Sequence, residues 1–160
     1  NGTELRMLKA GVLAPGFSNP DADMETVELS QFKGKILVLY FYVRDDTPGC
    51  TTEAIEFSDL EKKFTQLDAE VVGVSRDDCM KHSEFRDKHG ISVRLLADTE
   101  HTTCAAYGVL QDREVDGVMR QGVVRSTFII DKQGVIRHAL YGVSSRGHAE
   151  EVLQLVKELN

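Results

Sequence analysis

The chain has 160 residues, a size typical of one domain, and we expect residues 1–160 to form a single domain. Its 41% hydrophobic and 28% charged residues indicate an ordinary folded protein with a core, which excludes a disordered or fibrous chain. The formal net charge of −7 disfavours nucleic acid and anionic membranes as partners, since both are negatively charged.

Membrane and export signals are missing from the sequence pattern. The longest uninterrupted apolar run, residues 36–43, is far shorter than the roughly 20 residues that cross a bilayer. Residues 1–11 lack the basic start and the apolar stretch of a secretory signal peptide. We therefore expect a cytoplasmic protein that does not enter a membrane.

The cysteines and histidines do not have the spacing of a metal site. Cys50, Cys79 and Cys104 form no CxxC pair, which predicts neither structural zinc nor a disulfide framework and indicates a reducing compartment. The five histidines are scattered without an HExxH pattern, and we expect them at surface or capping positions. Nucleotide-binding glycine motifs are absent too, so we expect no metal and no cofactor.

The first predicted element of the sheet is a strand over residues 35–43. Its residues are β-branched, aromatic and apolar on both faces, as in a central strand buried between helices. After a polar loop, Thr47 is a plausible N-cap with Pro48 at the first helical position. The following helix has one apolar face, formed by Ala54, Phe57, Leu60, Phe64 and Leu67.

The middle of the chain continues the alternation of strands and helices. Gly90 is suited to a left-handed helix cap and ends the second helix. The predicted elements are a strand at 70–75, a helix at 78–88, a strand at 93–96, a short helix at 102–107 and a polar loop at 112–121.

The end of the chain changes to a hairpin and a helix. Residues 122–130 and 135–141 are predicted strands, joined by a turn at 131–134, and an amphipathic helix follows at 148–159. A βαβ unit followed by a ββα unit predicts an α/β protein of the thioredoxin-like fold, with a central mixed sheet flanked by helices.

Cys50 is the candidate nucleophile. It lies in the first helical turn after the most buried strand, and α/β sheets place reactive groups beyond the carboxyl ends of their strands. If Thr47 is the N-cap, Cys50 is the third helical residue, where free N–H groups and the helix dipole stabilise a thiolate. The alternative is that Cys50 packs as a small apolar residue.

A family resemblance supports the interpretation of Cys50 as a nucleophile. Residues 41–54 (FYVRDDTPGCTTEA), with RSTF at 125–128, resemble the peroxiredoxins of the bacterioferritin comigratory protein or peroxiredoxin Q class. The likeness extends over nearly the whole chain, through APGF at 14–17, LSQFKG at 29–34, GVSRD at 73–77, LLAD at 95–98 and AYGV at 106–109. It implies a thioredoxin-like fold with an N-terminal extension, and reduction of hydrogen peroxide and organic hydroperoxides by a thiol.

The resemblance also implies roles for individual residues. Cys50 matches the peroxidatic cysteine, Thr47 the active-site threonine, Arg125 the arginine that closes the site, and Glu53 an acidic residue that holds this arginine. Tyr42, Val43 and Pro48 are then the wall of the active site. These roles suit the chemistry, because attack on an O–O bond requires a thiolate, donors that orient the peroxide and a fixed cation.

Arg125 is conspicuous without the resemblance. It interrupts the apolar run at 123–130, which predicts a strand with an arginine inside it. A buried guanidinium requires an anionic partner, whereas an arginine on an edge strand points to water.

The sequence departs from the family at three positions. Val43 stands where the family has a proline that shields the thiolate, and valine supplies apolar cover without the fixed φ of proline. Many members carry a resolving cysteine five residues after the peroxidatic one, but that residue is Ile55 here. Others carry it at a position that aligns with Arg86.

Cys79, seven residues before Arg86, is the nearest substitute for the resolving cysteine. Two helical turns move it about 10 Å along the helix axis. A disulfide allows Cα atoms at most about 7 Å apart, so a bond to Cys50 requires local unfolding of both helix starts. Resolution by an external thiol is the alternative. We expect Cys104 to be buried and to pack in the core.

The implied partners are peroxides and thiol reductants. Cys50 would be recycled from sulfenic acid by thioredoxin, glutaredoxin or another reductant, in a protein expected to be a monomer. Two other functions on this fold are a thiol-disulfide reductase, which normally has a CxxC pair, and a redox sensor that reacts once and passes the oxidation to a partner.

Overall fold

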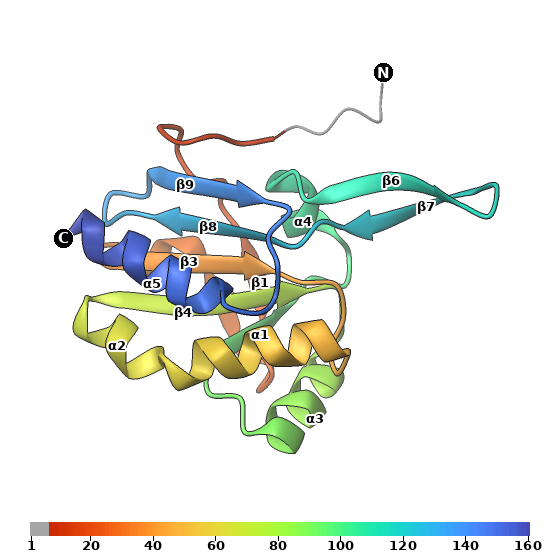
Figure 1. Ribbon diagram of the computed structural model, residues 1–160, viewed down its shortest axis with the longest axis horizontal. Helices are drawn as coiled ribbons and strands as arrows, with labels where there is room; N and C mark the ends of the chain where they lie inside the picture. The colour runs from red at the N-terminus through yellow and green to blue at the C-terminus, as the bar shows by residue number, and fades with distance from the viewer. Residues whose placement is uncertain (1–6) are drawn as a thin grey trace.

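A five-stranded mixed sheet forms the centre of the computed structural model, which describes residues 7–160 (Figure 1). Its strands follow the order β5-β4-β3-β8-β9. β3 pairs in parallel with β4, and β4 with β5, whereas β8 runs antiparallel to both β3 and β9. The strands are β3 (Ile36–Phe41), β4 (Ala69–Ser75), β5 (Arg94–Ala97), β8 (Ser126–Ile130) and β9 (Ile136–Tyr141). The arrangement is the predicted α/β plan, with the most apolar strand in the middle.

The helices lie close to where the sequence predicts them. They are α1 (Pro48–Asp59), α2 (Glu61–Gln66), α3 (Cys79–His89), α4 (Thr102–Ala106) and α5 (His148–Leu159). The predicted helix after Thr47 is divided at Leu60 into α1 and α2. Gly90 has the predicted left-handed conformation, with φ 65°, and ends α3. Within residues 7–160, none of the helices has both the length and the hydropathy needed to cross a bilayer.

The N-terminal extension packs on the sheet as two short strands and one turn of helix. These are β1 (Ser18–Pro20), β2 (Thr26–Glu28) and the 3-10 helix η1 (Leu29–Phe32), and β1 pairs antiparallel with β2. Residues 1–6, which belong to the stretch inspected for a signal peptide, lie outside the described residues.

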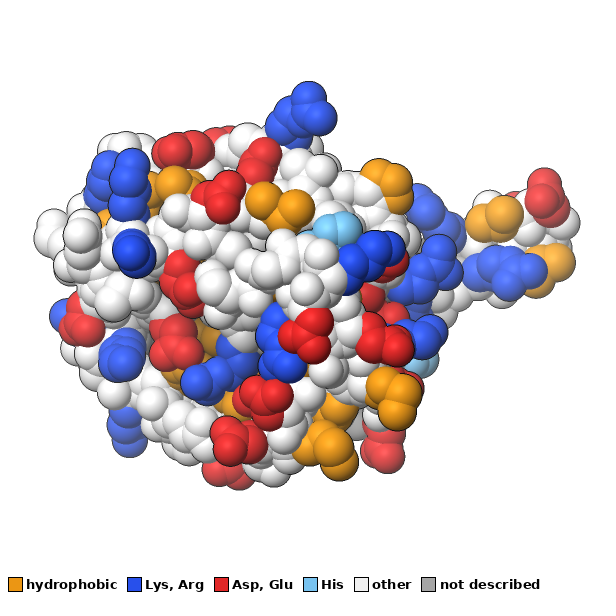
Figure 2. Space-filling view, turned by 90° about the horizontal axis from the view of Figure 1, so that it is seen from below, with side chains coloured by type: hydrophobic (Ala, Val, Ile, Leu, Met, Phe, Trp, Pro, Cys, Tyr) orange, Lys and Arg blue, Asp and Glu red, His pale blue; other side chains and the backbone are white. Residues whose placement is uncertain are grey.

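The prediction of a polar loop at 112–121 is wrong. The chain forms a hairpin of β6 (Leu110–Val115) and β7 (Val118–Val123), which projects from the body of the molecule (Figure 2). Its turn is Asp116-Gly117, both with positive φ, 53° and 78°, as the two-residue turns of hairpins require. Most residues of both strands are exposed, and their apolar residues do not alternate with polar ones in the way that marks a strand packed on a core.

The predicted strand at 122–130 also requires correction. Residues 122–123 complete β7, and the chain then leaves the hairpin and starts β8 at Ser126. Arg125 therefore lies in the link between two strands rather than inside one. An arginine in this link can point toward the carboxyl end of β3, because β8 runs antiparallel to β3 there.

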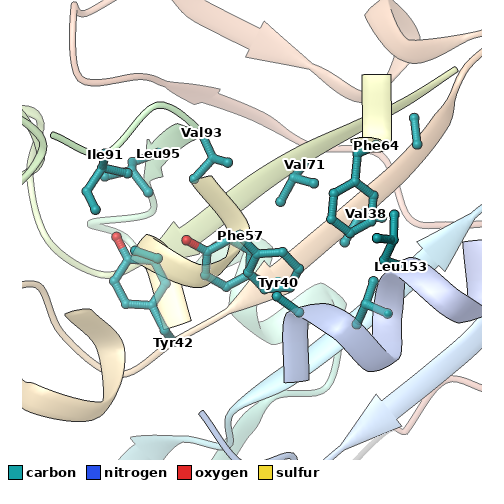
Figure 3. Packing of buried hydrophobic residues seen from close by; sticks show 14 of the residues in the cluster. Val38, Tyr40, Tyr42, Phe57, Phe64, Val71, Ile91, Val93, Leu95 and Leu153 are labelled. Carbon is teal, nitrogen blue, oxygen red and sulfur yellow. The ribbon is translucent and has the colours of Figure 1, made fainter. Parts of the chain in front are cut away.

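Two apolar clusters, one on each face of the sheet, form the core. Alternate residues of β3 divide between them, with Val38 and Tyr40 on one face and Leu37 and Leu39 on the other. The first cluster also includes residues of α1, α2, α3 and α5, among them Phe57, Phe64 and Leu153 (Figure 3). The second is covered by the N-terminal extension and α4. The sheet is thus buried on both faces, and β3 ends under the first turn of α1.

Candidate active site

The site begins where β3 passes into α1. Thr47 has the extended backbone of an N-cap, with φ −92° and ψ 153°, and Pro48 is the first helical residue, both as predicted. The Thr47 hydroxyl donates to the carbonyl oxygen of Arg44 at 2.9 Å instead of capping the helix. Cys50 is the third helical residue and is 1% exposed. Cys50 therefore belongs to the first turn, whose N–H groups have no partner within the helix.

Arg125 reaches Cys50 from the far side of the sequence. Its Nη2 lies 3.3 Å from the Cys50 sulfur, and its Nη1 donates to Glu53 Oε1 at 2.6 Å. Glu53 is fully buried on α1, so the guanidinium has the anionic partner that burial demands. One carboxylate thus holds one arginine against one thiol.

Burial and mutual contact act on the charges of Glu53 and Arg125 in this trio. Burial raises the pKa of Glu53 to about 7, although Arg125 acts in the opposite direction. Burial lowers the pKa of Arg125, but Glu53 and Cys50 outweigh it, and the net shift is upward. The arginine therefore remains a cation at neutral pH and favours negative charge on the sulfur beside it.

Gly49 gives the arginine room to lie over the helix. A Cβ atom at this position would lie 3.3 Å from both Arg125 Nη2 and Ser145 Oγ, which is tighter than ordinary contact. The absence of a side chain at Gly49 thus lets the guanidinium approach the first turn of α1 closely.

The three predicted wall residues occupy different environments. Val43 is 43% exposed, and Pro48 is exposed as well, so both lie at the surface near the start of α1. Tyr42 is buried instead, and its hydroxyl donates to Asp45 Oδ1 at 2.6 Å. Tyr42 thus supports the loop before α1 from inside the protein.

A buried histidine next to this loop has no signal in the sequence. His82 on α3 is fully buried, with Nδ1 2.6 Å from Asp45 Oδ2 and Nε2 2.8 Å from the Leu96 carbonyl oxygen. Both ring nitrogens thus lie within hydrogen-bond distance of an oxygen atom, and these two contacts fix the orientation of the ring. His148 is also buried, with Nε2 2.8 Å from the Thr127 hydroxyl. The expectation of surface or capping positions is therefore wrong for His82, and His148, although first in α5, is part of the core.

Asp45, Asp77 and His82 come close enough together to suggest a metal site. One ligand atom from each lies within 4.8 Å of the others. However, the Asp45 oxygens already accept from Tyr42 and His82, and Asp77 Oδ2 accepts from the Asp45 N–H and the Ser75 hydroxyl. The carboxylate oxygens are thus already paired with donors of the protein, so the cluster fits an internal hydrogen-bond network rather than a metal site.

The other two cysteines differ from Cys50. Cys79 is the first residue of α3 and is partly exposed, and burial, Asp21 and Asp78 raise the pKa of its thiol. Cys104 is fully buried, as expected, and burial raises the pKa of its thiol far above the usual range. Neither thiol has a cation in contact, so Cys50 is the one cysteine within the described residues whose sulfur touches a guanidinium.

Comparison with known proteins agrees with this geometry. Residues 10–139 match the AhpC/TSA family. The chain is 41% identical to Peroxiredoxin Bcp of Bacillus subtilis over 96% of its own length and 98% of that protein. It is 36% identical to Peroxiredoxin Bcp of Escherichia coli, over 94% of its length and 97% of that protein.

Solved structures give the same result. A structure of a mutant of peroxiredoxin Q from Xanthomonas campestris is similar at a TM-score of 0.90 and 32% identity, covering 96% of this chain and 100% of that one. A structure of the bacterioferritin comigratory protein of the same organism, described in connection with alkyl peroxide reduction, has a TM-score of 0.88 at 30% identity and covers 98% and 99% of the two chains.

Proposed function

The chain belongs to the AhpC/TSA family as a thiol-dependent peroxidase of the Bcp or peroxiredoxin Q type, and from this premise we propose that Cys50 is its peroxidatic cysteine. The observation that carries the proposal is the contact of 3.3 Å between the Cys50 sulfur and Arg125 Nη2. Glu53 fixes the same guanidinium at 2.6 Å, so the cation is in place before a peroxide arrives.

The reaction transfers one oxygen to sulfur. The Cys50 thiolate attacks one oxygen of the peroxide, an S–O bond forms, and the O–O bond breaks. The sulfur loses two electrons and becomes sulfenic acid, while the other oxygen leaves as hydroxide or alkoxide and takes a proton to become water or an alcohol. Negative charge moves from sulfur to the leaving oxygen during this step.

Arg125 and the start of α1 stabilise this charge movement. The arginine touches the sulfur and bears a positive charge that favours both the thiolate and the departing oxyanion. The N–H groups of the first turn provide donors that orient the peroxide, and the Thr47 hydroxyl, whose proton goes to the Arg44 carbonyl oxygen, provides an acceptor for the peroxide O–H. Val43 and Pro48 form the outer wall, and Tyr42 supports it from within.

The substrates are hydrogen peroxide and alkyl hydroperoxides. The similar Xanthomonas campestris protein is described as active in alkyl peroxide reduction. Val43, which is 43% exposed, provides apolar surface beside the site, and such surface suits the alkyl group of an organic hydroperoxide.

The sulfenic acid is then reduced, through Cys79 or directly by an external thiol. Both cysteines lie at helix starts, and Cys50 is buried, so a disulfide between them requires the first turns of α1 and α3 to unwind. The final reductant is thioredoxin, glutaredoxin or another thiol. The three cysteines, without a disulfide framework, suit the reducing cytoplasm, and the resemblance to peroxiredoxin Q implies a monomer.

The test is one equivalent of hydrogen peroxide added to the reduced protein, followed by intact and peptide mass spectrometry. Wild type, Cys50→Ser and Cys79→Ser are compared. Loss of two hydrogens with a peptide linking Cys50 and Cys79, absent from both variants, would establish internal resolution. Sulfenic or over-oxidised Cys50 with Cys79 still a thiol would establish resolution from outside.

One result would refute the assignment of Cys50 itself. If Cys50 remains an unmodified thiol while another residue is oxidised, the contact with Arg125 does not mark the peroxidatic cysteine. Cys104→Ser is the matched control, because Cys104 is also buried but lies beside an acidic residue rather than a cation. Its oxidation pattern should equal that of wild type.

A further inference from the structure

The β6–β7 hairpin extends beyond the end of the sheet at which α1 begins (Figure 1). Its strands pair with each other and with no other strand within residues 7–160. Residues 111–121 are exposed throughout, so most of both faces is open to solvent. A projecting ribbon of this kind contributes little to the core and provides surface for contact with other molecules.

The two faces of the hairpin differ in charge. Cross-strand partners share a face, so Arg113 lies beside Arg120 and Val115 beside Val118 on one of them. The other face has Asp112 and Glu114. We call the first the arginine face and define it by Arg113, Val115, Val118 and Arg120.

The arginine face has a cost in folding that no salt bridge within residues 7–160 offsets. Like charges directly opposite on a hairpin repel each other. Within residues 7–160, neither Arg113 nor Arg120 forms a salt bridge. Val115 and Val118, at 42% and 51% exposure, add apolar surface next to the two charges. The combination is suited to an acidic surface that also presents an apolar side chain.

More positive charge gathers where the hairpin joins the body. Arg76 Nη1 donates to the Gln121 carbonyl oxygen on β7 at 3.4 Å. Figure 2 shows Lys and Arg side chains both on the hairpin and beside its base. Arginines gathered on one face of the hairpin and at its base are unexpected in a chain of net charge −7, so their placement does not follow from composition.

The hairpin is also joined directly to the candidate active site. The Val124 N–H donates to the Val109 carbonyl oxygen at 2.7 Å, which fixes the base of the hairpin. The next residue is Arg125, which contacts Cys50. A protein bound to the hairpin is therefore held at the same end of the molecule as the reactive sulfur.

We propose that the arginine face is the docking surface for the acidic face of a protein dithiol that reduces oxidised Cys50. The inference rests on the proposed function and adds the charge of the partner and the place where it binds. The two thiols of the partner supply two electrons and two protons. Cys50 sulfenic acid then returns to the thiol, with one water released and a disulfide formed in the partner.

The test compares two charge reversals of equal size. The first double variant, Arg113→Glu with Arg120→Glu, reverses the charge of the arginine face. The second, Lys33→Glu with Lys35→Glu, reverses two exposed lysines that precede β3, at the end of this strand away from Cys50. Peroxide turnover is measured with an acidic thioredoxin, kept reduced by thioredoxin reductase and NADPH, and separately with dithiothreitol. The thioredoxin assay is repeated at ionic strengths of about 0.02 and about 0.3 M.

The arginine-face variant should lose at least about tenfold in kcat/KM for thioredoxin and most of its salt dependence. The lysine variant should remain within about twofold of wild type, and all three proteins should turn over equally with dithiothreitol. Equal losses in both variants, no loss in either, or wild type that uses dithiothreitol but not acidic thioredoxin would each overturn the docking proposal. Wild type inactive with dithiothreitol would instead refute the role of Cys50.

Discussion

At Glu53, burial and a neighbouring cation act in opposite directions on one carboxyl group. Burial raises its pKa to about 7 even with Arg125 hydrogen-bonded to Oε1, and Oε2 has no hydrogen-bond partner within residues 7–160. Burying the Glu53 carboxylate therefore lowers the stability of the fold. This loss is tolerated because the carboxylate fixes Arg125, whose charge serves the chemistry of Cys50.

This cost predicts how stability depends on pH. The pKa of Glu53 is raised in the folded protein from an ordinary value of 4.5 to about 7, so its contribution to stability is present below the lower value and is lost as pH rises through the higher one. The side chain of Glu53→Gln cannot titrate, so this variant should lose less free energy of unfolding than wild type as pH rises between these two values. The free energy of urea unfolding, measured from about pH 4.5 to about pH 8, checks this.

Glu84→Gln is the control for that experiment, since Glu84 is an exposed carboxylate and should leave the pH profile of wild type unchanged. A Glu53→Gln protein with the same slope as wild type would contradict the buried titration. The same variant should also oxidise more slowly at Cys50, because Arg125 loses its anionic anchor.

How far the site is visible in the sequence differs between its residues. Cys50, Thr47 and Pro48 follow from the pattern of a strand, a cap and a helix, and the structure places them as predicted. The pairing of Glu53 with Arg125 joins residues 72 positions apart, and only the resemblance to a family indicated it. His82 had no signal, since a single histidine on a polar helix does not reveal that its ring is buried.

At the scale of elements, one glycine allows close packing of a ring between β3 and β4. Tyr40 on β3 lies opposite Gly73 on β4, and its ring stacks on Phe57 of α1 with centroids 4.6 Å apart. A Cβ on Gly73 would lie 2.6 Å from Cζ of Tyr40. The glycine weakens the strand locally but makes room for an aromatic ring that joins the sheet to the Cys50 helix.

Gly73→Ala should therefore destabilise the protein by about 1–3 kcal/mol, because the fully buried ring of Tyr40 must move in a closely packed core. Denaturant unfolding measures the loss. Gly122→Ala on β7 is the matched control, with no atom within 4 Å of the added Cβ, and should change stability little. Equal effects of the two substitutions would argue against the close contact at Gly73.

The hairpin shows why elements with a core face are predicted more reliably than exposed ones. β3, β4 and α5 bury apolar residues at a regular spacing, and the sequence predicts each of them within a few residues. β6 and β7 have no such spacing, because they are solvated on both faces. Their only local signal is Asp116-Gly117, a dipeptide that favours a tight turn.

For the whole molecule, the buried network around His82 connects parts that the sheet alone does not hold. Asp45 precedes α1, His82 lies on α3, and the Leu96 carbonyl belongs to β5. The Asp45 N–H also donates to Asp77, which follows β4. The network therefore ties the loop before Cys50 to the helix that begins with Cys79, the two segments that must open for a disulfide between these cysteines.

A double-mutant cycle tests whether the buried pair of Asp45 and His82 acts as one unit. Asp45→Asn and His82→Gln should each destabilise by about 3 kcal/mol, because each leaves the other group buried without its partner, and the double variant should lose clearly less than the sum. Urea unfolding gives these energies, and hydrogen exchange should show residues 42–47 and α3 losing protection together. His89→Gln, which breaks a similar pair with the exposed Asp46, should have little effect on either measurement. Strict additivity, or loss of protection in α3 alone, would mean that the loop before Cys50 and α3 open independently.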